Sequence, residues 1–294
     1  MGPATKLREL LAAGPAVMAP GVVDALYARL VAQHGFEALY MTGAGTSATR
    51  LGMPDVGLLT MTEMVDNAAR IAAASDLPVI ADCDNGYGGP LNVRRAVQEY
   101  ERAGVAAIHL EDQVLPKRCG HLAGKQLISP AEMAAKVRAA ADARRDADFL
   151  LIARTDALAV EGLERALERA ALYAEAGADL LFVEAPGPAE VGAIPGRLPR
   201  PAVYNMATSG KTPFLNRTEI GGLGYRLILY PNWLLLAAIQ AAGSVLETLR
   251  RDGTIAGIAP QLPDFRRFFD LVGMQDVRAL EERYGVADEK RLDY

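Results

Sequence analysis

Short apolar runs alternate with longer segments of helical spacing along almost the whole chain. Each run is mostly apolar on both faces and rich in β-branched or aromatic residues, which is typical of strands in a fully buried parallel sheet. Between the runs we predict helices, several ending in Ala-Gly, which is a helix stop signal. The predicted strands lie at 16–20, 38–43, 78–84, 106–112, 149–156, 180–186, 201–206 and 225–231, and predicted helices include Leu91–Ala103, Pro130–Arg144 and Leu163–Ala176.

Eight strand–helix units within about 240 residues favour an α/β fold of the (β/α)8 barrel type over a doubly wound open sheet. The open sheet stays as the alternative, because counting units from a sequence errs easily by one. We expect residues 1–252 to form the barrel. Residues 253–294, with helical-looking segments at 260–274 and 276–286, exceed what a barrel needs. They predict an appended C-terminal helical extension, used between subunits.

The composition narrows the function classes. The 294 residues carry 36 Asp and Glu against 31 Lys and Arg, a net charge of −5, which argues against nucleic-acid binding through phosphate neutralisation. No apolar run reaches the ~18 residues of a membrane span, and the amino terminus lacks the core of a signal peptide. We therefore expect a cytoplasmic protein that does not engage membranes. The two cysteines, Cys83 and Cys119, exclude a disulfide framework and a cysteine-only zinc site.

Polar residues gather where the predicted strands end, which is the catalytic face of a (β/α)8 barrel. Charge near a strand core is costly unless it is paired or bound to a metal, so this pattern predicts one convergent acidic site. The alternative, helix N-capping by Asp, accounts readily for Asp156 and also suits Asp112, but it explains Asp82 poorly. The strand-end residues are Thr42, Gly43, Asp82, Asp84, Glu111, Asp112, Arg154, Asp156, Glu184 and Asn205.

Asp82 and Asp84 lie at positions i and i+2, so in a strand both side chains point to the same face. Two close carboxylates repel unless they share a proton or a cation, and hard oxygen ligands suit Mg²⁺ or Mn²⁺. With Glu111 ending the next predicted strand, the pattern predicts a divalent-metal site. His109 either orients a metal ligand or is a core histidine bonded to a backbone carbonyl.

A basic, glycine-containing loop at 116–125 follows the fourth predicted strand. Cys119 lies there among cations such as Lys117 and His121, and neighbouring cations lower the pKa of a thiol from its usual ~8.5. The glycines give the loop freedom to close over a ligand. We interpret the segment as a catalytic loop, with a solvated basic loop carrying an incidental cysteine as the alternative.

Four motifs follow one another along the chain: Asp82-x-Asp84-x-Gly86-x-Gly88, Leu110-Glu-Asp-Gln113, Lys117-Arg-Cys-Gly-His121 and Ala153-Arg-Thr-Asp156. In this order they resemble the isocitrate lyase/phosphoenolpyruvate mutase superfamily, and matching segments run from about residue 20 to residue 252. The third motif is similar to that of the branch formed by 2-methylisocitrate lyases, 2,3-dimethylmalate lyases and carboxyphosphonoenolpyruvate mutases. The resemblance implies a (β/α)8 barrel whose eighth helix is swapped between subunits of a homotetramer.

The resemblance also implies roles for individual residues. Mg²⁺, or Mn²⁺ in its place, is expected at Asp82, Asp84, Asp55 and Glu111, with Asp84 the most direct ligand. Catalytic roles are expected for Cys119, Lys117, Arg154 and His121. Substrate contacts are expected from Thr42, Gly43, Ala44, Gly120, Arg154, Glu184, Asn205 and Thr212. Two positions depart from the relatives' pattern, Thr208 where close relatives usually carry Glu and Ala44 where methylisocitrate lyases usually carry Gly, and both bear on substrate recognition.

The reaction implied is cleavage of a carbon–carbon bond in a 2-hydroxy di- or tricarboxylate such as 2-methylisocitrate. It yields a 2-oxo acid such as pyruvate and a carboxylate such as succinate. Mg²⁺ would polarise the substrate, Arg154 would stabilise the carbanion and Cys119 would protonate it. The alternatives on the same scaffold are a mutase or hydrolase acting on a P–C bond and an oxaloacetate decarboxylase. A non-catalytic binding protein is disfavoured because both Lys117 and Cys119 are present.

Overall fold

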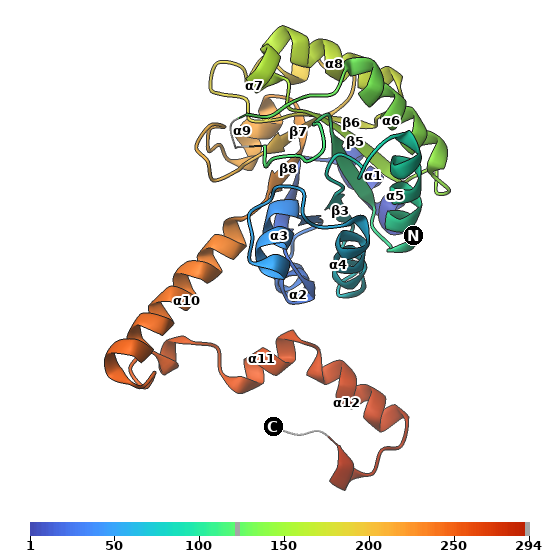
Figure 1. Cartoon of the computed structure of the whole chain (residues 1–294). Helices are drawn as coiled ribbons and strands as arrows, with labels where there is room; N and C mark the ends of the chain where they lie inside the picture. Colours follow the sequence, from blue (N-terminus) through green and yellow to red (C-terminus); the bar gives the residue numbers. More distant parts are fainter. Residues whose placement is uncertain (121–123, 292–294) are drawn as a thin grey trace. The chain divides into compact units, whose positions relative to one another are not determined.

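The computed structural model describes residues 1–120 and 124–291, apart from the side chain of residue 289. Eight parallel strands close into a barrel in which each strand pairs with the next and the last pairs with the first (Figure 1). The (β/α)8 prediction is confirmed, and the open doubly wound sheet is excluded. The strands are β1 Val17–Val22, β2 Leu39–Met41, β3 Val79–Asp82, β4 Ala107–Glu111, β5 Leu150–Thr155, β6 Leu180–Val183, β7 Ala202–Asn205 and β8 Tyr225–Tyr230.

The helices begin where local sequence favours a helix start. Pro90 and Pro130 occupy first-turn positions of α5 and α6, where the missing N–H is not needed, and Ser129 caps α6. The predicted helices at 91–103, 130–144 and 163–176 match α5, α6 and α8 within one residue. The helices of the barrel region are α1 Pro3–Ala13, α2 Ala25–Gln33, α3 Gly43–Leu51, α4 Met61–Ala73, α5 Pro90–Arg102, α6 Pro130–Ala143, α7 Leu158–Glu161, α8 Leu163–Glu175 and α9 Arg217–Gly222.

The barrel interior is filled by alternate residues of the strands. Ile80, Ile152 and Phe182 belong to one buried cluster, which Leu7 of α1 joins. Moving two positions toward the carboxyl end of each strand keeps a side chain on the same face. The same inward face therefore carries polar residues at the carboxyl ends of these strands and their neighbours, namely Thr42, Asp82, Glu111, Arg154, Glu184 and Asn205.

Contacts divide the chain into two units, Met1–Leu235 and Leu236–Tyr294. The second unit contains most of α10 Trp233–Asp252, together with α11 Phe265–Leu271 and α12 Met274–Arg283, so the predicted C-terminal helical segment is present. Many of its apolar side chains are exposed in the single chain, among them Leu246, Phe265 and Phe268. Across the described ranges, no helix has both the length and the apolar character needed to cross a bilayer.

Candidate active site

The polar ends of the strands surround a cavity of 180 Å³ at the carboxyl end of the barrel. Eleven residues predicted for the site line it, from strands, from the start of α3 and from the loop after β4. They are Thr42, Ala44, Asp55, Asp82, Glu111, Lys117, Cys119, Gly120, Arg154, Glu184 and Asn205. The structure thus brings together residues spread over more than 160 positions of sequence.

Three other predicted residues that the structure describes do not line this cavity. The backbone N–H of Gly43 donates to Asp82 Oδ2 at 3.1 Å, and Asp84 pairs with Lys117, so both adjoin the site. Thr212 is buried but absent from the residues that line the cavity. His121 lies outside the described residues.

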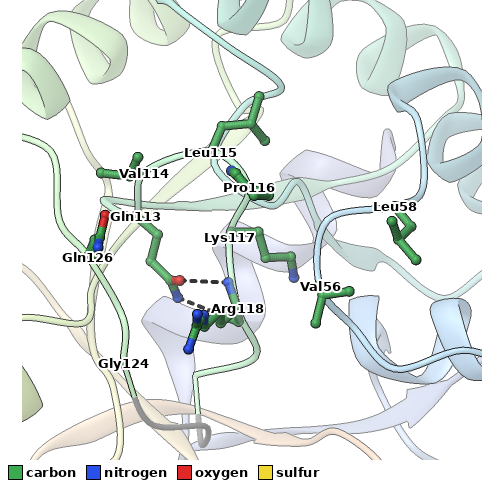
Figure 2. Close-up of a pocket in the computed structure, with 10 residues that line it drawn as sticks. All are labelled: Val56, Leu58, Gln113, Val114, Leu115, Pro116, Lys117, Arg118, Gly124 and Gln126. Atoms are coloured by element: carbon green, nitrogen blue, oxygen red, sulfur yellow. Dashed lines mark hydrogen bonds between the residues drawn. The ribbon is translucent and has the colours of Figure 1, made fainter.

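A larger cavity of 710 Å³ shares Lys117 with the site (Figure 2). Its described lining is mostly apolar and includes no Asp or Glu. We therefore place the chemistry in the smaller, charged cavity. The lining residues are Val56, Leu58, Gln113, Val114, Leu115, Pro116, Lys117, Arg118, Gly124 and Gln126.

Four carboxylates, Asp55, Asp82, Asp84 and Glu111, form what we call the acidic cluster. The ammonium of Lys117 lies within it, 2.7 Å from Asp55 Oδ1 and 2.6 Å from Asp84 Oδ1. Both ion pairs are almost completely buried, so solvent screens them little. The loop lysine is therefore a counter-ion of the acidic cluster.

Asp84 reaches the acidic cluster by a different route from the one predicted. Strand β3 ends at Asp82, and Asp84 follows with φ of 47°, a left-handed conformation that is uncommon outside glycine. The interpretation that both carboxylates share one face of a strand is therefore wrong. A turn instead places Asp84 beside Asp82, and the Asp84 N–H donates to Asp82 Oδ1 at 2.9 Å.

Burial and mutual repulsion perturb the acidic cluster. Burial raises the pKa of Asp84 to about 6, with Asp82 and Asp55 adding to the rise and Lys117 opposing it. Burial also raises the pKa of Glu111 well above its ordinary value, against the effect of Arg154 and Lys117. Glu111 Oε1 is buried with no hydrogen-bond partner among the described residues. Asp84 and Glu111 are therefore biased toward the protonated form, because Lys117 and Arg154 do not offset the burial of these carboxylates.

The acidic cluster fits a divalent cation by donor type and charge. Its donors are hard carboxylate oxygens, the kind that Mg²⁺ prefers, and Glu111 Oε1 is a buried donor without a partner. No three His, Cys, Asp or Glu side chains in the described part of the chain are arranged to hold a metal as they stand. Lys117 supplies the positive charge at Asp55 and Asp84 instead.

Arg154 is the second cation of the site. Its guanidinium lies 3.1 Å from Glu184 and 3.4 Å from Glu111, and it donates two hydrogen bonds of 3.1 Å to Asp156. Asp156 is therefore a buried partner of Arg154, and its interpretation as a helix cap is wrong, since Ala157 is at that position of α7. Asn205 donates to Glu184 and completes this side of the cavity.

Asp112 is not a helix cap either. Its carboxylate accepts hydrogen bonds from Thr155 Oγ1 at 2.7 Å, the Asp156 N–H at 2.9 Å and Tyr173 OH at 2.8 Å, and it pairs with Arg169. Ser129 caps α6 in its place. Asp112 is thus the centre of a buried polar network that joins β4, β5 and α8.

His109 faces the site rather than a backbone carbonyl. Its Nε2 lies 2.9 Å from Tyr40 OH and 3.6 Å from Asp82 Oδ1, and its Nδ1 has no partner among the described residues. Burial lowers the pKa of His109, which favours the neutral imidazole. Neither interpretation is confirmed, because the hydrogen-bond partner of His109 is Tyr40 and its 3.6 Å separation from Asp82 is too long for a hydrogen bond.

The loop after β4 carries Lys117 and comes close to Arg154. Lys117 is buried and Cys119 is partly exposed, and the Cys119 N–H donates to the Asp55 carbonyl at 3.1 Å. A Cβ added at Gly120 would lie 2.0 Å from Arg154 Nη2, so only glycine fits there without a shift. These contacts therefore position the backbone at Cys119 and Gly120.

Some lining residues escaped sequence reasoning. Asn232 follows β8, and the rule that strand ends carry the site could have found it. Tyr40 lies two positions before Thr42 on the inward face, where its aromatic ring looked like core. Ala207, Ser209 and Pro231 carried no signal.

The chain is similar in sequence to known proteins over almost its whole length. The sequence profile of the phosphoenolpyruvate phosphomutase family matches residues 7–250. The chain is 46% identical to 2,3-dimethylmalate lyase of Eubacterium barkeri over 97% of this chain and 99% of that protein. It is 44% identical to 2-methylisocitrate lyase of Aeropyrum pernix over 93% of this chain and 88% of that protein.

Solved structures share the whole fold. Oxaloacetate acetylhydrolase in complex with the inhibitor 3,3-difluorooxalacetate superposes with a TM-score of 0.93 at 39% identity, covering 98% of each chain. Phosphonopyruvate hydrolase in complex with oxalate and Mg²⁺ superposes with a TM-score of 0.89 at 32% identity, covering 97% of this chain and 99% of that one.

Proposed function

The chain belongs to the phosphoenolpyruvate mutase/isocitrate lyase superfamily, and from that premise we propose that it is a carbon–carbon lyase. Its substrate class is a 2-hydroxy di- or tricarboxylate, of which 2-methylisocitrate and 2,3-dimethylmalate are representatives. The observation that carries the proposal is a single cavity that combines three carboxylates of the acidic cluster, a buried arginine and a loop cysteine. Lyases acting on such substrates are 44% and 46% identical to the chain.

The acidic cluster would hold Mg²⁺, with Mn²⁺ as a substitute. Asp82, Asp84, Asp55 and Glu111 are the residues that would hold it, and a related hydrolase binds Mg²⁺ together with oxalate. Bound there, the ion would supply Lewis-acid stabilisation of the negative charge on the substrate oxygen. In this proposal Lys117 moves away from Asp55 and Asp84 and contacts the substrate instead, because one ammonium and a divalent ion compete for the same carboxylate oxygens.

Arg154 and the start of α3 position the substrate. A helix N-terminus favours anions, and α3 begins at Gly43 beside Asp82, so the substrate carboxylate next to the hydroxyl would lie there. The guanidinium of Arg154 would face the second carboxylate, into which the negative charge of the departing carbon spreads. Glu184 and Asp156 hold that guanidinium in place.

Cys119 supplies the proton. Cleavage would transfer the hydroxyl proton to a carboxylate of the acidic cluster, turn the hydroxyl carbon into a carbonyl and leave the electron pair of the broken bond on the departing carbon. The Sγ–H of Cys119 would donate its proton to that carbon, leaving a thiolate that the cations Lys117 and Arg154 stabilise. The partial exposure of Cys119 within the cavity lining is consistent with this role.

A second candidate is hydrolytic cleavage of oxaloacetate. It is supported by the close structural match to oxaloacetate acetylhydrolase, at 39% identity. The lining residues Thr208 and Ser209 leave this wall of the cavity uncharged. Both reactions use the same acidic cluster, so product identity separates them.

We further propose that the C-terminal helices cover a second copy of the chain. Exposed apolar side chains recur along the second unit, including Ile239, Leu249, Leu262 and Phe268. Such a face in water favours association. A helix-swapped homotetramer is the expected assembly, and light scattering after gel filtration tests it.

The reaction is tested by incubating the protein and Mg²⁺ with 2-methylisocitrate, isocitrate, 2,3-dimethylmalate, oxaloacetate and phosphonopyruvate, and identifying products by NMR. Pyruvate released together with succinate or propionate supports the lyase. Acetate and oxalate formed from oxaloacetate alone support the hydrolase. Conversion of phosphonopyruvate alone, or no reaction at all, contradicts the lyase proposal.

A further inference from the structure

The loop that carries Lys117 and Cys119 is tied to the barrel by buried side chains outside the proposed chemistry. The two stems of this loop pair through the Val114 N–H, which donates to the Gln126 carbonyl at 2.9 Å, and through a bridge between Gln113 and Leu127. The stems bring Gln113 and Lys125 close to Asp156, and both side chains are buried. Neither residue lines the charged cavity.

Gln113 holds the segment on one side of Cys119. Its Nε2 donates to the Arg118 carbonyl at 2.9 Å and its Oε1 accepts the Arg118 N–H at 2.9 Å (Figure 2). The same Nε2 lies 3.1 Å from Asp156 Oδ2. The Gln113 side chain thus hydrogen-bonds both backbone groups of Arg118 and links them to Asp156.

Lys125 holds the segment on the other side. Its ammonium donates to the Gly120 carbonyl at 2.5 Å and to Asp156 Oδ1 at 2.8 Å. The carbonyl of Gly120 therefore has a buried, charged donor. Hydrogen bonds to charged groups are roughly twice as strong as hydrogen bonds between neutral groups.

Asp156 joins these two anchors to Arg154. One carboxylate accepts from Gln113, Lys125 and the Arg154 guanidinium, and it is fully buried. Its position therefore sets the position of Arg154 and of the backbone on both sides of Cys119 together. A shift of Asp156 would move the arginine and the thiol at once.

We propose that Gln113, Lys125 and Asp156 form a clasp that positions Cys119 and Lys117 against Arg154 for the reaction. The inference rests on the proposed function, because it assigns the clasp to the loop that carries the proposed proton donor. The three are positioning residues, since they touch the loop backbone and Arg154 rather than the cavity.

Two variants test the clasp with little disturbance of Arg154. Lys125→Met removes the ammonium, and Asp156 keeps its pairing with Arg154. Gln113→Met removes the amide and keeps the side-chain volume. Gln126→Met is the matched control, because Gln126 is a neighbouring, exposed side chain and only its backbone carbonyl bonds to the other stem.

The primary readout is hydrogen exchange of the Arg118 and Cys119 amides, which needs no substrate. Both clasp variants are expected to raise exchange at these amides about ten- to a hundredfold, the loss of one or two buried bonds, while β4 and β5 keep their protection. Turnover number is expected to fall by at least tenfold with KM changed less than threefold. The control variant is expected to match the wild type in both.

Three outcomes overturn the clasp: loop exchange that stays as in the wild type, exchange that rises equally throughout β4 and β5, or faster loop exchange with an unchanged turnover number. If the wild type turns over none of the five compounds, the lyase proposal fails. The exchange measurement still decides whether the clasp holds the loop.

Discussion

Gly120→Ala is the substitution that most sharply tests how the loop closes on the site. An added Cβ would lie 2.0 Å from Arg154 Nη2 and 2.9 Å from Glu184 Cγ, so one side must move. Displacing Arg154 breaks buried ion pairs to Asp156 and Glu184, at a cost of about 3–5 kcal/mol. Moving the loop instead breaks its bond to Lys125 and strains its neighbours, at about 2–3 kcal/mol.

The loop, rather than Arg154, is therefore expected to move. A cost of about 2–3 kcal/mol lowers the population of the closed loop, and with it the turnover number, by about 30- to 150-fold. The same cost lowers Tm by about 4–12 °C for a chain of this size. Gly196→Ala is the control, because nothing lies within 4 Å of its added Cβ.

The assays are steady-state kinetics on the substrate that the wild type cleaves and scanning calorimetry. Wild-type turnover in Gly120→Ala would refute the closed geometry, because the loop would then not need to reach Arg154. A collapse of the barrel, with Tm lowered by more than 20 °C, would refute the argument that the loop yields before Arg154.

Three further substitutions separate the parts of the site. Cys119→Ser is expected to abolish turnover and to leave Mg²⁺ and oxalate binding within threefold of wild type, measured by stopped assay and calorimetry; full activity would contradict the proton-donor role. Mg²⁺ at 100 times its Kd is expected to stabilise the wild type by about 2.7 kcal/mol, which raises Tm by about 5–11 °C. The Asp84→Asn variant is expected to lose this Tm shift. An equal Tm shift in the variant would show that Asp84 does not bind the metal. Asp112→Ala is expected to destabilise the fold by about 3 kcal/mol in denaturant titrations, because Tyr173 and Thr155 lose a buried acceptor; a change under 1 kcal/mol would contradict the network.

The alternation of apolar runs and helical segments was enough to predict the barrel. Seven of the eight predicted runs contain one strand each, and β1 begins within the remaining run and extends two residues beyond it, because a strand buried on both faces leaves a continuous apolar signature. The polar residues at the strand ends were predictable for the same reason, since an inward position that changes from Ile80 to Asp82 stands out. The motif resemblance then added residues such as Ala44, Asp55 and Thr212.

Long-range partners were beyond the sequence. Nothing local indicates that Lys117 would lie between Asp55 and Asp84, 62 and 33 positions away, or that Lys125 would reach Asp156. The error at Asp156 has the same origin. An aspartate after a strand has the local features of a helix cap, and only the fold shows that Arg154 donates hydrogen bonds to the Asp156 carboxylate. The prediction that Asp82 and Asp84 share one face of β3 was wrong because a turn with positive φ at Asp84 leaves no recognisable pattern of residue types.

The proposed function requires the acidic cluster to bind a cation, which in turn binds a 2-oxo acid. Calorimetric titration of oxalate into the protein, with Mg²⁺ and with EDTA, measures this directly, since oxalate carries the two adjacent oxygens that such a cation binds. We predict binding in Mg²⁺ that weakens at least a hundredfold in EDTA. Oxalate affinity that is equal in Mg²⁺ and EDTA would contradict the account.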